Sequence, residues 1–296
     1  MKLLTFKQNN KQKLGIHTDQ GIIDVEATIK ETNQTHIRTD IMDIIASTPA
    51  EMEVMTNFVK QALNDHTAIF VSEDQIIWEP SVTRPGKIIC VGLNYAKHAD
   101  ETGSPYPKSP ILFSKFTNAL TGHKSDVTIP RLTRKLDYEV ELAIIIGKQA
   151  RNVNQTEALD YVFGYSTAND LSARDLQFKT PQWLLGKTSD GFAPIGPYLV
   201  TADAIKNPNE LTLKTYVNGV LKQDSNTSDM IFSCEDLISY ISQVVTLEPG
   251  DVILTGTPEG VVMGRPEDQQ IFIQPGDEVT VEVEQLGALT NYFIDE

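Results

Sequence analysis

The chain has 296 residues, of which 40% are hydrophobic and 22% charged, a composition typical of a packed globular protein rather than a disordered one. Its 25 basic and 40 acidic residues give a formal net charge of −15. A protein this acidic repels nucleic-acid phosphates and anionic lipid, so we expect neither nucleic acid nor a membrane as a partner. An anionic ligand would need a local positive centre to overcome the overall charge.

The N-terminal segment and the cysteines bear on location. The chain turns polar from Lys7 onward, whereas a secretory signal needs roughly 7–15 apolar residues there. No stretch approaches the roughly 18 apolar residues of a membrane span. Cys90 and Cys234 lie in apolar surroundings without metal-ligand spacing, so we expect buried free thiols. These features predict a cytoplasmic protein.

Residues 1–80 are expected to form a small α+β domain. Strand-like stretches cover residues 2–6, 14–17 and 21–25, and helical patterns follow Asp40, a candidate N-cap, and then cover about residues 51–63. The segment 79–86 contains two prolines and a glycine, and we place the domain boundary there.

Residues 87–296 read as a second domain in which strands predominate. Strand patterns cover residues 87–91, 111–113, 138–146, 162–168, 211–216, 251–255, 278–284 and 289–294. Asn218-Gly219 predicts a tight hairpin turn. Helices are expected at 156–161, at 171–178, and at 234–245 behind Ser233. Strands and helices do not alternate, so we predict an α+β, mostly β fold rather than a doubly wound one.

Carboxylates concentrate at one end of the strand predicted over residues 138–146. Side chains alternate along a strand, so Asp137, Glu139 and Glu141 share one face. The apolar run that follows predicts an interior strand, where unpaired carboxylates cost several kcal/mol each, on the order of the effective burial penalty of an ion. They must be protonated, paired with basic groups or bound to a cation, unless this end of the strand emerges into water.

Asp170 adds a third carboxylate at the end of the strand predicted over 162–168. A helix N-cap is the ordinary role of an aspartate in this position. If it joins Glu139 and Glu141, the site has only oxygen ligands, which favour Mg²⁺ or Mn²⁺, with Ca²⁺ as an alternative and Zn²⁺ disfavoured. Three protein ligands leave coordination positions for water or substrate.

Five segments, taken together, resemble the motif series of the fumarylacetoacetate hydrolase family and occur in its order. They are GLNYAKH (92–98), DYEVEL (137–142), NDLSARDLQ (169–177), GKTSDGFAP (186–194) and LTGTPEG (254–260). The resemblance covers roughly residues 87–294. It implies a mixed β-roll catalytic domain, usually in a homodimer.

The resemblance also implies roles for particular residues. Glu139, Glu141 and Asp170 match the family's metal ligands, and His98 and Glu101 match an acid/base pair of the acylpyruvate hydrolase branch. Lys187, Gln177 and Thr257 match substrate-contacting positions. Arg174 lies in the same motif as Gln177, and we assign it to substrate binding.

The residues themselves are compatible with these roles. His98 and Glu101 are three positions apart, so on a helical turn the carboxylate can orient the imidazole; two exposed side chains on a loop are the alternative. Lys187 lies in an apolar setting where it needs an anionic partner or a path to solvent. Small residues around Thr257 could hold a carboxylate or form an ordinary turn. The segment 102–110, rich in proline, resembles a lid that closes over substrate.

The implied substrate is a small 2-oxo acid, and several reactions share its chemistry. A bound cation would stabilise the enolate that forms when a bond to C3 breaks. We expect hydrolysis of a C–C bond in a 3-acylpyruvate. The alternatives are decarboxylation or tautomerisation of oxaloacetate, isomerisation of an unsaturated oxo-diacid, and a metal-stabilised scaffold without turnover.

Overall fold

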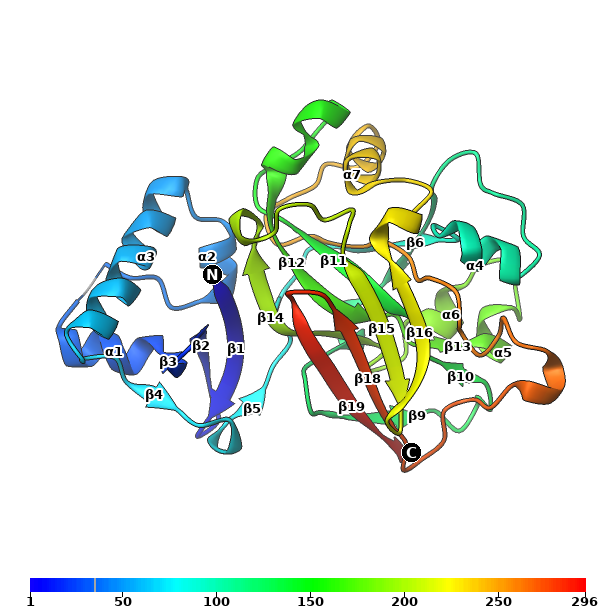
Figure 1. The fold of residues 1–296 in the computed structure, drawn as a ribbon, viewed down its shortest axis with the longest axis horizontal. Helices are drawn as coiled ribbons and strands as arrows, with labels where there is room; N and C mark the ends of the chain where they lie inside the picture. The colour runs from blue at the N-terminus through cyan, green and yellow to red at the C-terminus, as the bar shows by residue number, and fades with distance from the viewer. Residues whose placement is uncertain (35) are drawn as a thin grey trace.

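The computed structural model describes residues 1–34 and 36–296, and its largest element is a mixed sheet that runs through most of the molecule (Figure 1). Along the sheet the strands follow the order β4-β3-β2-β1-β14-β12-β11-β17-β6-β7. Their bounds are Phe70–Val71, Gly21–Asp24, Lys11–Thr18, Lys2–Gln8, Ala193–Thr201, Val162–Asn169, Val140–Ile146, Val252–Leu254, Ile88–Gly92 and Ile111–Lys115. β5 (Ile77–Trp78) pairs with β1, and β8 (Leu120–Thr121) pairs with β14.

The N-terminal region adds helices to one end of this sheet. They are α1 (Val25–Thr32), α2 (Ile41–Ile45) and α3 (Pro49–Asn64). Asp40 caps α2 by accepting the Met42 N–H at 2.8 Å, as the sequence predicts. The strand expected to reach residue 25 ends at Asp24, because the Asp24 side chain caps α1 by accepting the Ala27 N–H. Sequence patterns missed α1.

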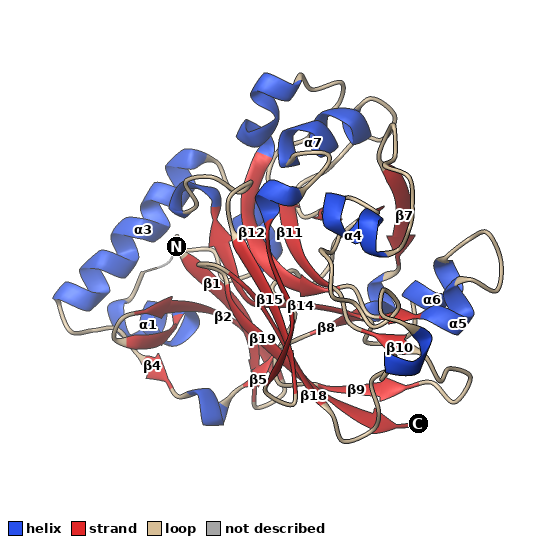
Figure 2. Cartoon of the chain, turned by 45° about the vertical axis from the view of Figure 1, so that its right-hand side comes forward, coloured by secondary structure: helices blue, strands red, loops and turns tan. Residues whose placement is uncertain are grey.

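The N-terminal strands continue directly into the sheet of the larger region, because Leu3 of β1 pairs with Leu199 of β14. The division into domains of residues 1–80 and 87–296 stays a prediction. In Figure 2, α1 and α3 lie near the N-terminal strands, whereas α4 (Ala96–Glu101), α5 (Arg174–Gln177) and α6 (Leu184–Lys187) gather on the opposite side of the molecule.

A second mixed sheet packs against the first. Its order is β16-β15-β18-β19-β9, with bounds Val220–Asn226, Thr212–Val217, Glu278–Val283, Gly287–Asp295 and Asp126–Ile129. The predicted hairpin joins β15 to β16, and Asn218 and Gly219 both have positive φ, at 50° and 77°. One hydrophobic core contains side chains of both sheets, among them Leu142 and Ile144 of β11 and Val281 of β18.

Several predicted elements differ from those observed. The strand expected over 138–146 begins at Val140, and a separate strand, β10 (Leu136–Asp137), pairs with β13 (Ser172–Ala173). The helix expected over 171–178 therefore shrinks to α5. Residues Gln155–Tyr161 form a 3₁₀ helix, and α7 (Cys234–Ser242) begins behind a capping box at Ser233 but ends three residues before position 245.

The fold class predicted from the sequence, α+β and mostly β, is confirmed by two mixed sheets with short helices around them. Cys90 and Cys234 are buried free thiols, as expected. Among the described residues, no helix has both the length and the apolar character needed to cross a membrane.

Candidate active site

Three buried carboxylates meet where β11 begins and β12, its neighbour in the large sheet, ends. Glu139 precedes β11, Glu141 lies on it, and Asp170 follows β12, the strand that pairs with β11. One oxygen of each lies within 4.8 Å of the others, and the residues are 5%, 1% and 0% exposed. The structure thus brings together the three predicted ligands. Neither the water-exposed strand end nor the N-cap alternative fits, because all three carboxylates are buried and Asp170 caps none of the helices in the described part of the chain.

Two predicted cationic residues contact this acidic group. Lys187 Nζ lies 2.6 Å from Glu139 Oε2 and 2.9 Å from Asp170 Oδ2, and Arg174 Nη2 lies 2.7 Å from Glu139 Oε1. Burial alone would raise the pKa of Glu139, but Lys187 and Arg174 lower it to about 2. Lys187 is buried and pairs with two carboxylates, so its ammonium group does not extend to solvent, the alternative that the sequence left open.

A further lysine, Lys115, was not predicted from the sequence. It ends the edge strand β7, its side chain is fully buried, and its ammonium pairs with Asp170 Oδ1 and donates to the Leu171 carbonyl at 3.0 Å. Burial lowers the pKa of Lys115 from its usual value, although Asp170 opposes this shift. No sequence motif marks Lys115 as a site residue, since it is the last residue of a short strand in which half-buried and exposed side chains alternate.

Glu141 differs from its two neighbours because no ion pair among the described residues includes it. Its Oε2 accepts the Gly256 N–H at 2.8 Å. Burial, followed by the charges of Asp170 and Glu139, raises the pKa of Glu141 well above its usual value. A positive charge at this point would remove that penalty. Three carboxylates with no histidine or cysteine ligand therefore fit a hard divalent cation, held by Glu139, Glu141 and Asp170.

Asp137, expected on the same face as the two glutamates, lies outside the group that could share one cation. It belongs to β10, and the strand is interrupted between Asp137 and Val140, so the alternation that places Glu139 and Glu141 together does not extend to Asp137. Its Oδ2 accepts from Arg174 Nε at 2.9 Å, so Arg174 lies between Asp137 and Glu139.

The predicted acid/base pair lies on α4. His98 Nδ1 is 2.8 Å from Glu101 Oε1, and His98 is 5% exposed. Because a carboxylate only accepts hydrogen bonds, Nδ1 carries the proton and Nε2 of a neutral ring keeps its lone pair. Glu101 is itself held by the Gly260 N–H, 3.0 Å from Oε2. The pair is thus an ordered element rather than two exposed side chains.

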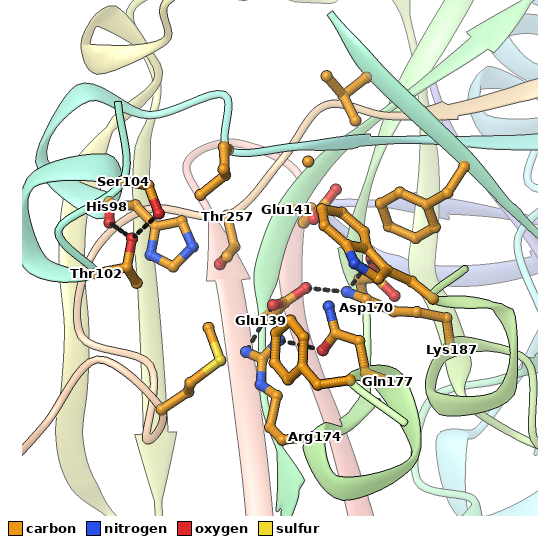
Figure 3. Close-up of a pocket in the computed structure, with 17 residues that line it drawn as sticks. His98, Thr102, Ser104, Glu139, Glu141, Asp170, Arg174, Gln177, Lys187 and Thr257 are labelled. Atoms are coloured by element: carbon orange, nitrogen blue, oxygen red, sulfur yellow. Dashed lines mark hydrogen bonds and ion pairs between the residues drawn. The ribbon is translucent and has the colours of Figure 1, made fainter. Parts of the chain in front are cut away.

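A cavity of about 170 Å³ connects these groups. Figure 3 shows His98 on one side and Glu139, Glu141 and Asp170 across from it, with Thr257 between them in this view. Arg174, Gln177 and Lys187 also line the cavity, so all nine predicted site residues except Glu101 face it. Glu101 stands behind His98.

Fixed contacts orient the remaining polar residues. Gln177 Oε1 accepts from Arg174 Nη1 at 2.9 Å, and the Thr257 hydroxyl accepts from Gln223 Nε2 at 2.9 Å. The segment 102–110, expected to act as a lid, contributes Thr102 and Ser104 to the cavity wall beside His98. Its closure over substrate stays a prediction.

The fold and the site define a class: a mixed-sheet protein in which three clustered carboxylates, able to hold a cation, face the same cavity as a buried histidine. Residues 87–294 match the family described as fumarylacetoacetate (FAA) hydrolase C-terminal. The chain belongs to the fumarylacetoacetate hydrolase family, as the sequence motifs predict.

Three similar proteins illustrate the range of named activities. The chain is 42% identical to oxaloacetate tautomerase Fahd2a, mitochondrial, of Rattus norvegicus, over 85% of this chain and 83% of the rat protein. It is 33% identical, with a TM-score of 0.83, to the fumarylacetoacetate hydrolase of psychrophilic Exiguobacterium antarcticum, covering 100% of both chains. It is 30% identical, with a TM-score of 0.79, to maleylpyruvate hydrolase from Sphingobium sp. SYK-6 in complex with manganese(II) ion and pyruvate, covering 100% of this chain and 99% of that one.

One expectation is corrected by these comparisons. The sequence predicted a cytoplasmic protein, but the rat relative is named as mitochondrial. Net charge and the polar residues from Lys7 onward exclude few compartments, and they do not distinguish the cytoplasm from an organelle.

Proposed function

We propose that this protein is a divalent-cation-dependent enzyme that acts on small 2-oxo dicarboxylates and interconverts the keto and enol forms of oxaloacetate. One observation carries the proposal: the buried His98, held by Glu101, faces the same cavity as the three carboxylates. The name of the rat relative favours this reaction over the C–C bond hydrolysis that we expected first from the sequence.

Glu139, Glu141 and Asp170 would hold the cation. When bound, it would act as a Lewis acid that stabilises the negative charge developing on the 2-oxo group. We propose Mg²⁺ or Mn²⁺, since all three ligands are carboxylates and the similar maleylpyruvate hydrolase was crystallised with manganese(II). Lys115 and Lys187 both pair with Asp170 and hold its carboxylate in place.

His98 would move the proton. In the keto form a proton leaves C3 of oxaloacetate for His98 Nε2, and the imidazolium then returns a proton from Nε2 to the oxygen on C2, which gives the enol and restores the neutral ring; the reverse sequence restores the keto form. No water is consumed and no C–C bond breaks. Glu101 keeps Nδ1 protonated and stabilises the imidazolium that forms.

The cationic side of the cavity would bind the substrate's carboxylates. Lys187 and Arg174 supply positive charge there, and Gln177 and Thr257 supply polar groups. Only together with the bound divalent cation would Lys187 and Arg174 provide the local positive centre that a protein of net charge −15 needs in order to bind a dianion, because both side chains already pair with carboxylates.

Hydrolysis of a 3-acylpyruvate is the second candidate. The Thr102 and Ser104 side chains line the cavity next to His98, and Thr102 Oγ1 lies 3.1 Å from Ser104 Oγ. Their hydroxyls offer partners for a water that His98 could activate for attack on the C4 carbonyl. The named activity of the maleylpyruvate hydrolase favours this reaction.

Product analysis by NMR separates the candidates. The cation-loaded protein is offered oxaloacetate, acetylpyruvate, fumarylpyruvate and a hydroxymuconate-type diacid in parallel. We expect faster keto–enol exchange of oxaloacetate without new acids. Pyruvate and carbon dioxide from oxaloacetate would indicate decarboxylation, pyruvate and a second acid would indicate hydrolysis, and a shifted double bond in the diacid would indicate isomerisation.

Controls decide whether any activity belongs to this site. EDTA should abolish turnover, and Mg²⁺ or Mn²⁺ should restore it. His66→Ala, which replaces an exposed histidine, should retain full activity. Absence of turnover on all four compounds by the loaded protein would contradict the proposal and favour a binding scaffold.

The homodimer implied by the family resemblance stays a proposal. β7 lies at the edge of the large sheet, and Leu112, Phe116 and Leu185 near it are 39%, 54% and 56% exposed. Such an edge with apolar side chains suits a second copy of the chain. Light scattering after size-exclusion chromatography would give the mass, and a monomer would contradict this proposal.

A further inference from the structure

Asp137 is a fully buried aspartate that the proposed proton transfer does not use. Its Oδ1 accepts the Tyr138 N–H at 2.9 Å and the Val262 N–H at 2.9 Å. Its Oδ2 accepts the Met263 N–H at 3.0 Å and Arg174 Nε at 2.9 Å. All four partners are donors, so both oxygens are committed and the group is unsuited to bind a cation or accept a proton from substrate.

One of these partners leads to the acidic group. Arg174 turns its Nε toward Asp137 and its Nη2 toward Glu139 Oε1, at 2.7 Å. Asp137 and Glu139 thus hold the guanidinium from two sides, and Arg174 lines the cavity. The Arg174 side chain therefore links Asp137 to Glu139, one of the three carboxylates proposed to hold the cation.

The other partners lead to the acid/base pair. Val262 and Met263 belong to a loop, residues 260–264, that packs directly on Glu101. The Gly260 N–H donates to Glu101 Oε2 at 3.0 Å, and a Cβ placed on Gly264 would lie 2.5 Å from Glu101 Cδ. Glu101 in turn holds His98. A shift of this loop would therefore move the base.

We propose that Asp137 is a positioning residue that fixes Glu101, and through it His98, relative to the acidic group. The inference rests on the proposed function, in which His98 transfers the proton. Without Asp137 the amides of Val262 and Met263 lose their acceptor. The 260–264 loop then keeps the hydrogen bond from the Tyr138 hydroxyl to the Gly260 carbonyl, at 3.1 Å, but loses two of its bonds to the chain next to Glu139. Proton transfer depends steeply on such geometry, because a displacement of about 1 Å costs on the order of 10²-fold in rate.

A double-mutant cycle tests the coupling. Asp137→Asn keeps the size of the side chain but turns one acceptor into a donor facing other donors. We expect it to lower kcat by about tenfold or more in the otherwise wild-type enzyme, and by about twofold or less when Glu101→Gln is already present. Cation affinity, measured by calorimetry with Mn²⁺, should change by less than about threefold, because Asp137 is not one of the proposed ligands.

Asp251→Asn is the matched control. Asp251 is also fully buried and also accepts a backbone N–H, from Glu248. It lies just before β17, whereas the site residues Gly256 and Thr257 come after the other end of that strand. Whatever its effect on kcat, that effect should be the same with and without Glu101→Gln. Where Asp137→Asn fails to fold, Asp137→Ser leaves room for a water between the amides and Arg174 and provides the same comparison.

Hydrogen exchange gives a readout that does not depend on activity. The amides of Gly260, Val262 and Met263 should exchange faster in Asp137→Asn, whereas those of β11 should not. Equal losses of kcat in both backgrounds, unchanged kcat in a folded variant, a large loss of Mn²⁺ affinity, or unchanged exchange in the loop would each overturn the proposal. If instead Glu101→Gln alone has no effect on activity, the proposed function fails first.

Discussion

Replacement of Lys115 by methionine should be among the most destabilising single changes at the site. Methionine fills the space of the aliphatic stem but leaves Asp170 Oδ1 without its cation and the Leu171 carbonyl without its donor. Removing one partner of a buried ion pair costs about 3–5 kcal/mol, because the other charge stays buried. Lys187 still pairs with Asp170, so we expect a loss in the free energy of unfolding near the lower end, about 3 kcal/mol.

The assay is denaturant unfolding in EDTA, followed by the fluorescence of Trp78 and Trp183, the two tryptophans of the chain. Lys7→Met is the matched control, since Lys7 pairs with Glu79 at 2.7 Å but its side chain is 44% exposed. A surface pair of this kind contributes about 0–1 kcal/mol. Equal stability losses in the two variants would refute the buried pairing of Lys115 with Asp170.

Saturating Mn²⁺ adds a second arm to this experiment. A bound divalent cation supplies positive charge next to Asp170, so it should recover part of the stability that Lys115→Met loses. Lys7→Met should gain no such extra recovery. If Mn²⁺ stabilises both variants and the wild type by the same amount, the cation does not bind beside Asp170.

Three further predictions concern the site. Glu141→Gln should abolish Mn²⁺ binding in calorimetry while leaving the circular dichroism unchanged, and retained binding would contradict the proposed ligand set. His98→Ala should lower turnover by roughly 10²–10⁴-fold with cation affinity intact, as for loss of a general base; an unchanged rate would remove His98 from the mechanism. Gly256→Ala should weaken Mn²⁺ binding, because Gly256 has φ of +103° and a Cβ there would lie 2.8 Å from Asn94 Cβ. The backbone would have to shift, and the Gly256 N–H would move away from Glu141. A Mn²⁺ affinity equal to that of the wild type would show that this N–H does not position Glu141.

Local patterns were enough to predict the parts of the site that lie on regular elements. Side chains alternate between the two faces of a strand, and this rule placed Glu139 and Glu141 on one face. β11 is buried along its whole length, as its apolar run of residues indicated. Spacing of three placed His98 and Glu101 together on one helical turn. These rules use only the geometry of a strand or a helix.

Patterns failed where the backbone departs from a regular element. Asp137 was expected beside the two glutamates, but the chain interrupts the strand before Val140 and redirects the aspartate to Arg174. Lys115 lies on a short edge strand whose neighbours are half-exposed, and nothing local shows that its ammonium reaches Asp170 across the sheet. β14 carries two prolines and a glycine, which conceal a strand that becomes central once β1 and β12 pair with it.

Anomalous X-ray diffraction from crystals grown with manganese(II) tests directly whether the three carboxylates bind a cation. We predict one strong anomalous peak at coordinating distance from an oxygen of Glu139, of Glu141 and of Asp170, with its open side toward His98. A well-occupied peak elsewhere, with these three carboxylates bound only to protein groups, would contradict a cation site formed by Glu139, Glu141 and Asp170.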